Sequence, residues 1–156
     1  MIIGNTKIWE RKSVALGEGN VQALAVFENK YLFGITVYKW FTIDQIRFHT
    51  HAFNAIAFLI KGWYWEKVIF NDVEMTNFVN IPFWPRLIPR NYCHAIQHAK
   101  PGTMTIVFSG PWQKHWFEYF PDTKKWIKYN WGRKKVGSLD KLPESDKMTI
   151  NNTAVK

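Results

Sequence analysis

The sequence contains a single cysteine, Cys93, among its 156 residues. One cysteine excludes a disulfide within the chain, which fits a reducing compartment. The longest uninterrupted run of Ala, Val, Ile, Leu and Phe, residues 55–60, is far too short to span a bilayer. The N-terminal segment MIIGNTKIWERK also lacks the apolar run of a signal peptide. We therefore expect a cytoplasmic protein without a membrane partner.

Acidic residues are scarce, with 12 Asp and Glu against 21 Lys and Arg, so the net charge is +9. Few of the acids fall inside apolar segments, and this disfavours chemistry driven by a pair of carboxylates. The sequence also lacks a glycine-rich phosphate loop and a G-x-S-x-G nucleophile elbow. Phosphate-loop enzymes and serine hydrolases of that type are thereby excluded.

Positive charge gathers late in the sequence, at Lys114, Lys124, Lys125, Lys128, Arg133, Lys134 and Lys135. The simplest interpretation of these residues is a solvated basic surface. A basic balance favours anionic partners, but the sequence has no zinc finger, helix-turn-helix or RNP motif of a nucleic-acid-binding protein. We therefore expect a small anionic ligand, such as a nucleotide or a nucleotide sugar, rather than nucleic acid.

Hydrophobic and aromatic residues are abundant, at 47% and 17% of the sequence. Turn signals such as Lys61-Gly62 and Pro101-Gly102 separate short runs rich in Val, Ile, Thr and aromatics, and no window shows a useful helical period. The runs that we predict as strands are 21–27, 33–41, 63–70, 103–109, 115–120 and 125–129. This pattern predicts an all-β sandwich or barrel. Within 63–70, Glu66 and Lys67 indicate a solvated face or an edge strand.

The composition changes after about Gly137, where the polar segment SLDKLPESDKMTINNTAVK begins. This segment has few large apolar residues with which to pack. We predict a single β-barrel domain over residues 1–137 and a flexible polar tail over residues 138–156.

Two histidines, His49 and His51, stand one residue apart at the start of the apolar stretch FHTHAFNAIAFLIKGWYWE. Residues i and i+2 of a strand point to the same face, so the two imidazoles should lie side by side. His94, in the strand-like run IPRNYCHAIQ, is the best third member of a metal site. The alternative is that these histidines fill polar gaps in the core by bonding to the backbone.

The neighbours of His94 are assigned by the same alternation. Tyr92 shares the face of His94 and can place its hydroxyl in the cavity. His98, four residues beyond His94, should share that face too, at the border of the cavity. Cys93 should point to the opposite face, as a core residue rather than a nucleophile.

These residues resemble the two motifs of the cupin superfamily. The first motif, G-x5-H-x-H-x(3,4)-E-x6-G, matches at His49, His51 and Gly62; the second, G-x5-P-x-G-x2-H-x3-N, matches at Pro89 and His94. The motifs and their flanking strands cover about residues 20–130. The stretch around His49 is also similar to small phage and bacterial cupins of unsettled function. The resemblance implies a double-stranded β-helix, the jelly-roll barrel of cupins.

The sequence departs from the cupin motifs at several positions. Ala55 stands where the first motif has its Glu ligand, and only Asn54, one residue earlier, offers an amide oxygen. The leading glycines of the two motifs are replaced by Ile43 and Phe83, and the inner glycine of the second by Asn91. The four-ligand cupin site is therefore not intact, and a three-histidine site remains.

A three-histidine site resembles that of the cupin thiol dioxygenases. The resemblance implies an enzyme with one divalent transition metal on His49, His51 and His94, with Fe²⁺ favoured over Zn²⁺, Mn²⁺ or Ni²⁺. Three neutral ligands leave the metal charge uncompensated, which favours a small anionic substrate. The residues expected to take part in catalysis are His49, His51, Tyr92 and His98.

Two other functions fit the same residues. Some cupins isomerise or epimerise nucleotide sugars without a metal, using a His as acid–base catalyst, and other cupins only bind a ligand. In either case an arginine or a late lysine would hold the phosphates, and aromatic side chains would ring the barrel mouth. The residues expected to contact the ligand are Arg47, Asn54, Arg90, Trp63 and Trp65. The resemblance also implies a homodimer formed through strand edges.

Overall fold

The computed structural model describes residues 2–3, 6–16, 19–42, 47–113, 115–130 and 134–147. Nearly all regular structure in these ranges is β-strand, with one short 3₁₀ helix, η1 (Glu144–Asp146). The strands are β1 (Ile2–Ile3), β2 (Thr6–Leu16), β3 (Gly19–Asn29), β4 (Gly34–Thr42), β5 (Ala55–Lys61), β6 (Tyr64–Phe70), β7 (Val73–Val79), β8 (Pro85–Ile88), β9 (Cys93–Ala99), β10 (Met104–Ser109), β11 (His115–Phe120), β12 (Lys125–Asn130) and β13 (Lys134–Leu139). The all-β prediction is confirmed.

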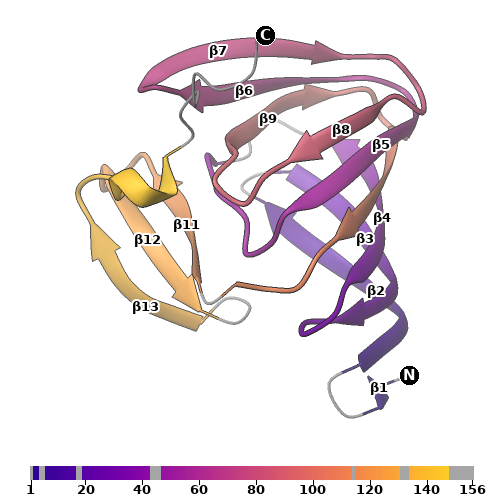
Figure 1. Ribbon diagram of the computed structural model, residues 1–156. Coiled ribbons are helices and arrows are strands. Elements are labelled where there is room, and N and C mark those ends of the chain that lie inside the picture. The colour runs from indigo at the N-terminus through magenta and orange to yellow at the C-terminus, as the bar shows by residue number, and fades with distance from the viewer. Residues whose placement is uncertain are drawn as a thin grey trace, which may run out of the picture.

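The strands form three antiparallel sheets (Figure 1). A seven-stranded sheet has the order β1-β2-β3-β4-β10-β5-β8, and two three-stranded sheets have the orders β7-β6-β9 and β11-β12-β13. Strand β10 pairs with β4 and with β5, so a late strand is inserted between two early ones. Figure 1 shows β6 and β7 across the top and β11–β13 on the left. Within the described ranges, no helix has the length and apolar character that crossing a lipid bilayer demands.

Strand β6 is joined to β7 by a short hairpin turn, and alternate side chains of β6 enter the protein. The turn residues Asn71 and Asp72 have φ values of 49° and 59°, and positive φ at both central positions matches the right-handed twist of paired strands. Along β6, Tyr64, Glu66 and Val68 are buried, and the residues between them are more exposed. Glu66 therefore lies on the inner face, and its predicted place on a solvated face is wrong.

The core lies between the seven-stranded sheet and the sheet of β6, β7 and β9. One buried cluster joins residues from β3 to β9: Val21, Trp40, Leu59, Tyr64, Val79, Ile96 and Ala99. A second cluster joins Cys93 of β9 to Phe117, Trp126 and Leu142. Burial raises the pKa of the Cys93 thiol to about 12. Cys93 is a core residue, as the alternation predicted.

The predicted tail begins inside a strand, because β13 runs on to Leu139. Beyond it, Leu142 and Asp146 are buried, and Asp146 Oδ1 accepts a 2.8 Å hydrogen bond from Arg90 Nη2. Asn91 Nδ2 donates to the Lys147 carbonyl at 3.0 Å. Residues 140–147 are thus attached to the loop before β9. Residues 148–156 lie outside the described residues, and the domain boundary at 137 stays a prediction.

Replacing Gly62 with alanine is expected to destabilise the fold by about 3 kcal/mol, because two costs combine. Gly62 has a φ of +89°, and an added Cβ would lie 2.8 Å from the Thr103 Cα and closer still to the Thr103 hydroxyl. Thr103 is fully buried, and its hydroxyl donates to the Lys100 carbonyl at 2.6 Å. Urea unfolding of the variant measures the loss.

Gly102→Ala is the matched control for that prediction. Gly102 also has a positive φ, of +82°, but an added Cβ would meet nothing within 4 Å. The control should therefore show only the backbone cost, about 1–2 kcal/mol. Equal losses in the two variants would show that the close approach to Thr103 contributes nothing.

Candidate metal centre

The segment that carries His49 and His51 is extended and lies between β9 and β11. His49 N donates to the His94 carbonyl at 2.9 Å, and His94 N donates to the His49 carbonyl at 3.1 Å. On the other side, Thr50 N donates to the Phe117 carbonyl at 2.9 Å. Because the backbone is extended, His49 and His51 project to the same side, and the pairing with β9 brings His94 next to them.

The three imidazoles form a compact cluster. Their ring centroids are 5.1 Å apart for His49 and His51, 4.8 Å for His49 and His94, and 5.1 Å for His51 and His94. One nitrogen from each ring lies within 4.8 Å of the others, and the Nε2 atoms of His51 and His94 are 3.2 Å apart. The predicted convergence of the three histidines is confirmed.

The spacing of one pair of nitrogens, His51 Nε2 and His94 Nε2, fits two ligands of a divalent transition metal. Two nitrogens bound at about 2.1 Å, with an angle between 90° and 110°, lie about 3.0–3.4 Å apart, as the Nε2 atoms of His51 and His94 do. His49 Nδ1 donates to the Arg47 carbonyl at 2.9 Å, so the Nε2 of a neutral His49 carries the lone pair. Burial, with His94 and His49 nearby, lowers the pKa of His51 well below its usual value, so His51 is neutral at pH 7.

A buried carboxylate that the sequence analysis did not assign to the site stands beside the cluster. Glu66 is fully buried, and its Oε2 accepts a 3.0 Å hydrogen bond from His94 Nδ1. Its Oε1 accepts a 2.8 Å hydrogen bond from the Tyr92 hydroxyl and forms an ion pair with Arg86 Nη2. Burial alone would raise the pKa of Glu66, but His94, Arg86 and Tyr92 lower it to about 2. Glu66 is therefore ionised at neutral pH.

Arg86 completes this network from the neighbouring sheet. It lies on β8, which pairs with β5, and its Nη1 donates to the Tyr64 hydroxyl. Tyr92 also lies next to the cluster, with its ring 5.2 Å from that of His94. Tyr92 thus lies on the side of His94, as the alternation predicted, and its hydroxyl is engaged with Glu66. We refer to Glu66, Arg86, Tyr64 and Tyr92 as the carboxylate network.

His98 is not on the face of His94, so its predicted place at the border of the cavity is wrong. The register of β6 with β9 shifts between Trp65, which pairs with His98, and Glu66, which pairs with Ile96. Gln97 is the extra residue of this bulge, and a bulge reverses the alternation beyond it. His94 and Ile96 are buried, whereas His98 is exposed.

The predicted aromatic lining lies on the outer face as well. Trp65 is 40% exposed and stacks on Phe78 at 4.4 Å, and the Trp63 ring lies 5.6 Å from that of His98. Since Trp65 precedes the inward-pointing Glu66, it must point away from the histidines. The expectation that Trp63 and Trp65 ring the barrel mouth is therefore wrong.

The predicted ligand-binding residues Arg47, Arg90 and Asn54 are engaged with other groups. The Arg47 guanidinium lies 3.6 Å from Glu118 Oε1 and packs over the Phe120 ring at 4.1 Å. Arg90 pairs with Asp146, and Asn54 Oδ1 accepts a 2.8 Å hydrogen bond from the Arg90 backbone N–H. Their contact with a ligand stays a prediction. Ala55, at the lost Glu position, is buried in the core.

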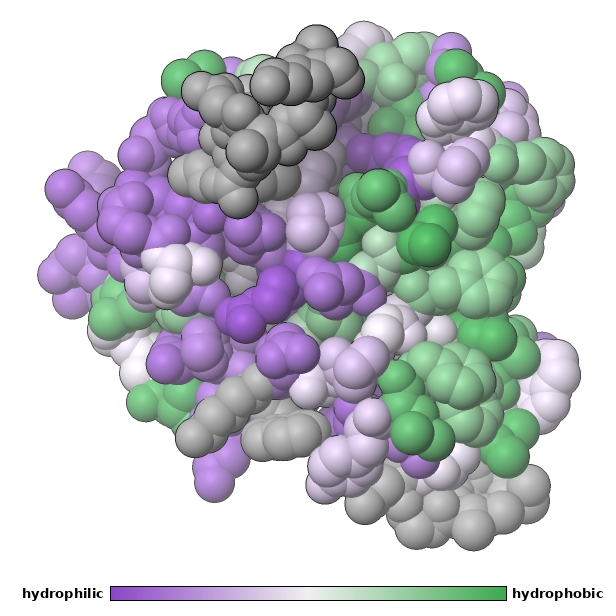
Figure 2. Space-filling view, viewed as in Figure 1, coloured by the Kyte–Doolittle hydropathy of each residue, from purple (hydrophilic) through white to green (hydrophobic). Residues whose placement is uncertain are grey.

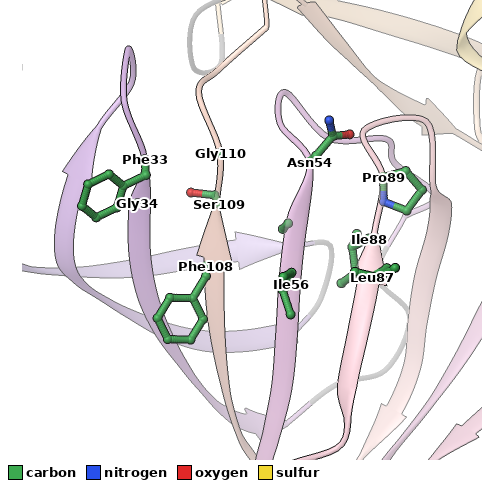
Figure 3. A pocket seen from close by; sticks show the side chains of 11 residues that line it. Phe33, Gly34, Asn54, Ile56, Leu87, Ile88, Pro89, Phe108, Ser109 and Gly110 are labelled. Atoms are coloured by element: carbon green, nitrogen blue, oxygen red, sulfur yellow. The ribbon is translucent and has the colours of Figure 1, made fainter.

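An apolar groove lies apart from the histidines, on the outer face of the seven-stranded sheet. It measures about 610 Å³ and runs across β4, β10, β5 and β8. Figure 3 shows Phe33, Phe108, Ile56 and Leu87 on neighbouring strands along it. Figure 2 shows hydrophobic surface over this side of the molecule and hydrophilic surface over β11–β13.

The basic stretch lies mostly on that hydrophilic side. Lys124, Lys125, Lys134 and Lys135 are exposed in the strands and turns of β11–β13, as expected for a solvated surface. Lys128 is half-buried and lies 5.9 Å from the Phe117 ring. Lys114 and Arg133 lie outside the described residues.

No family model and no curated protein matches the sequence, but solved structures are similar in fold. Oxalate decarboxylase from Bacillus subtilis matches with a TM-score of 0.51 and 11% identity over 71% of this chain and 30% of its own. An RmlC-like cupin from Shewanella frigidimarina matches at 0.48 and 13%, over 65% of this chain and 83% of its own. KdgF from Halomonas sp. matches at 0.49 and 14%, over 65% and 87%.

The chain therefore has the all-β cupin fold, the double-stranded β-helix that the histidine motifs implied. At these identities the likeness defines the fold alone. Inside that fold, this chain has a three-histidine cluster and a carboxylate network that reaches it from β6 and β8.

Proposed function

We propose that this chain is a small metal-dependent enzyme that holds one divalent metal on His49, His51 and His94 and acts on a small anionic substrate. The observation that supports it is the convergence of three imidazole nitrogens within 4.8 Å of one another. Fe²⁺ is the first candidate, because a three-histidine set leaves positions for both substrate and O₂. Mn²⁺ is the second, since oxalate decarboxylase from Bacillus subtilis contains Mn(II) centres. Zn²⁺ and Ni²⁺ also bind imidazole.

The charges of the site favour an anion. An imidazole binds a metal in its neutral form, and the negative charge of Glu66 is paired with the positive charge of Arg86. The positive charge of a bound metal is therefore not cancelled by the buried groups around it. An anionic substrate at the open positions would compensate this charge in a partly buried site, where charges are weakly screened.

A metal-free isomerase or epimerase acting on a nucleotide sugar is the second candidate. The hydrogen bond between His94 Nδ1 and Glu66 Oε2 supports it, because a carboxylate orients a histidine and stabilises its protonated form in acid–base catalysis. In that case Tyr92 would lie beside the reacting histidine. The two candidates differ in their need for a metal.

Oxygen consumption with a panel of small thiols and carboxylates tests the proposal. We expect turnover by the Fe²⁺-loaded protein with at least one member of the panel, loss of turnover after chelation, and recovery on adding Fe²⁺. The control is the same panel with the His51→Ala variant. Isomerisation of a nucleotide sugar that survives chelation would replace this proposal with the second candidate.

A further inference from the structure

Among the described residues, Glu66 is the only carboxylate in hydrogen-bond contact with a histidine of the cluster. Both of its oxygens accept hydrogen bonds. Its Oε1 receives Arg86 and the Tyr92 hydroxyl, and its Oε2 receives His94 Nδ1. Arg86 is itself fixed by the Tyr64 hydroxyl. These partners come from β6, β8 and β9 and from the loop before β9, so the carboxylate cannot rotate without breaking contacts to several elements.

This arrangement determines which nitrogen of His94 carries the proton. A carboxylate paired with an arginine only accepts hydrogen bonds, so His94 Nδ1 must donate to Glu66 Oε2. The Nε2 of a neutral His94 then carries the lone pair. This atom lies 3.2 Å from His51 Nε2, on the side where the three rings converge.

We propose that Glu66 is a positioning residue that fixes His94 in the Nδ1–H tautomer, so that Nε2 presents its lone pair to the metal position. The inference rests on the proposed function for its metal, but the tautomer is a property of the protein alone. Arg86 and Tyr92 serve Glu66 in turn by occupying Oε1, which leaves Oε2 for His94.

The tautomer of His94 also determines the state of the cluster before a metal binds. The 3.2 Å contact between two Nε2 atoms needs one donor, and the lone pair on His94 makes His51 that donor. His51 would have to move its proton off Nε2 for a metal to bind there. His94 carries its proton on Nδ1, so it could bind a metal through Nε2 without moving that proton.

Glu66→Gln tests this role with the least change of shape. The amide oxygen of the variant should turn toward Arg86 and Tyr92, which both donate, so that the amide N–H₂ faces His94 Nδ1. His94 would then accept at Nδ1 and carry its proton on Nε2. Because loss of a carboxylate behind a metal-binding histidine typically weakens metal binding 10- to 100-fold, we expect a loss of about that size.

The readouts are long-range ¹H–¹⁵N spectra of the histidine rings in metal-free protein at pH 8 and the equilibrium affinity for Mn²⁺. We expect His94 as the Nδ1–H tautomer in the wild type and the Nε2–H tautomer in Glu66→Gln. Glu74→Gln is the matched control, because Glu74 lies on β7, is half exposed and pairs with Lys67 at 2.6 Å. It should leave both readouts unchanged.

Two results would overturn the inference: an Nε2–H tautomer of His94 in the wild type, or an Mn²⁺ affinity of Glu66→Gln within about threefold of the wild type. The first readout needs only the wild type, so it decides the matter even where the variant does not fold. A wild type with the Nδ1–H tautomer but no affinity for any divalent metal would contradict the proposed function and leave the positioning of His94 by Glu66 intact.

Discussion

Replacing His51 with alanine is expected to lower the affinity for a divalent metal by more than about 100-fold, the upper end of what loss of an indirect contact causes. His51 supplies the nitrogen closest to that of His94, at 3.2 Å, and its removal leaves two ligands on nearly adjacent backbone positions of β9 and the segment beside it. The measurement is an anaerobic titration with Fe²⁺, repeated with Mn²⁺.

His98→Ala is the control for that experiment. It makes the same chemical change, but the bulge at Gln97 places His98 on the outer face beside Trp63. Its metal affinity should equal that of the wild type. If His51→Ala bound the metal as tightly as His98→Ala does, the three-histidine assignment would be wrong.

Glu66→Met is expected to destabilise the protein by about 3–5 kcal/mol, because it leaves a buried charge without its partner. Arg86 is mostly buried, and Glu66 is its only described ion-pair partner. Methionine keeps a similar length and adds no polar group, so the loss reports the missing charge rather than a cavity. Unfolding in urea, followed by fluorescence, measures the change in the free energy of unfolding.

The double variant Glu66→Met/Arg86→Met separates this explanation from simple loss of packing. Removing both charges leaves no unpaired ion, so the double variant should be more stable than Glu66→Met alone. If the double variant lost as much free energy of unfolding as the two single variants together, or more, the two charges would not be coupled in the folded protein.

The depressed pKa of Glu66 also gives stability a defined dependence on pH. The folded protein holds this carboxylate at a pKa of about 2, against 4.5 for the ordinary value. The resulting stabilisation is present above pH 4.5 and is lost as the pH falls toward 2, and it amounts to about 3 kcal/mol at neutral pH. His51 acts in the same direction below its ordinary pKa of 6.5, since its folded pKa is lowered. Comparing the wild type with Glu66→Gln isolates the part due to Glu66.

The alternation of side chains along a strand was enough to predict on which face the central residues of the site lie. His49 and His51 are two residues apart in extended backbone, and Tyr92, Cys93 and His94 take the faces that their positions predict. These placements depend only on the spacing of residues along an extended strand, and that spacing can be read from the sequence. His94 was chosen as the third histidine because it lies in a second strand-like run, and the cupin motifs matched the same residue.

The predictions for His98 and Glu66 were wrong for two different reasons. A bulge interrupts the alternation before His98, and the alternation was not applied to Glu66. One extra residue at Gln97 moves His98 to the outer face, and nothing in CHAIQHA marks the bulge. Glu66, in contrast, shares its parity with Tyr64 and Val68, so the sequence did carry a signal that it points inward. Its partner Arg86 lies on β8, and β8 pairs with β5 rather than β6. That contact depends on how two sheets face each other, which no local pattern shows.

The most direct test of the central claim is the metal content of the protein purified without an affinity tag or chelator. Elemental analysis should find close to one equivalent of a single transition metal per chain, because His49, His51 and His94 define one site. A folded protein that contains no metal, and that takes up neither Fe²⁺ nor Mn²⁺ nor Zn²⁺ when these are added, would contradict the account and make the histidines acid–base or binding residues.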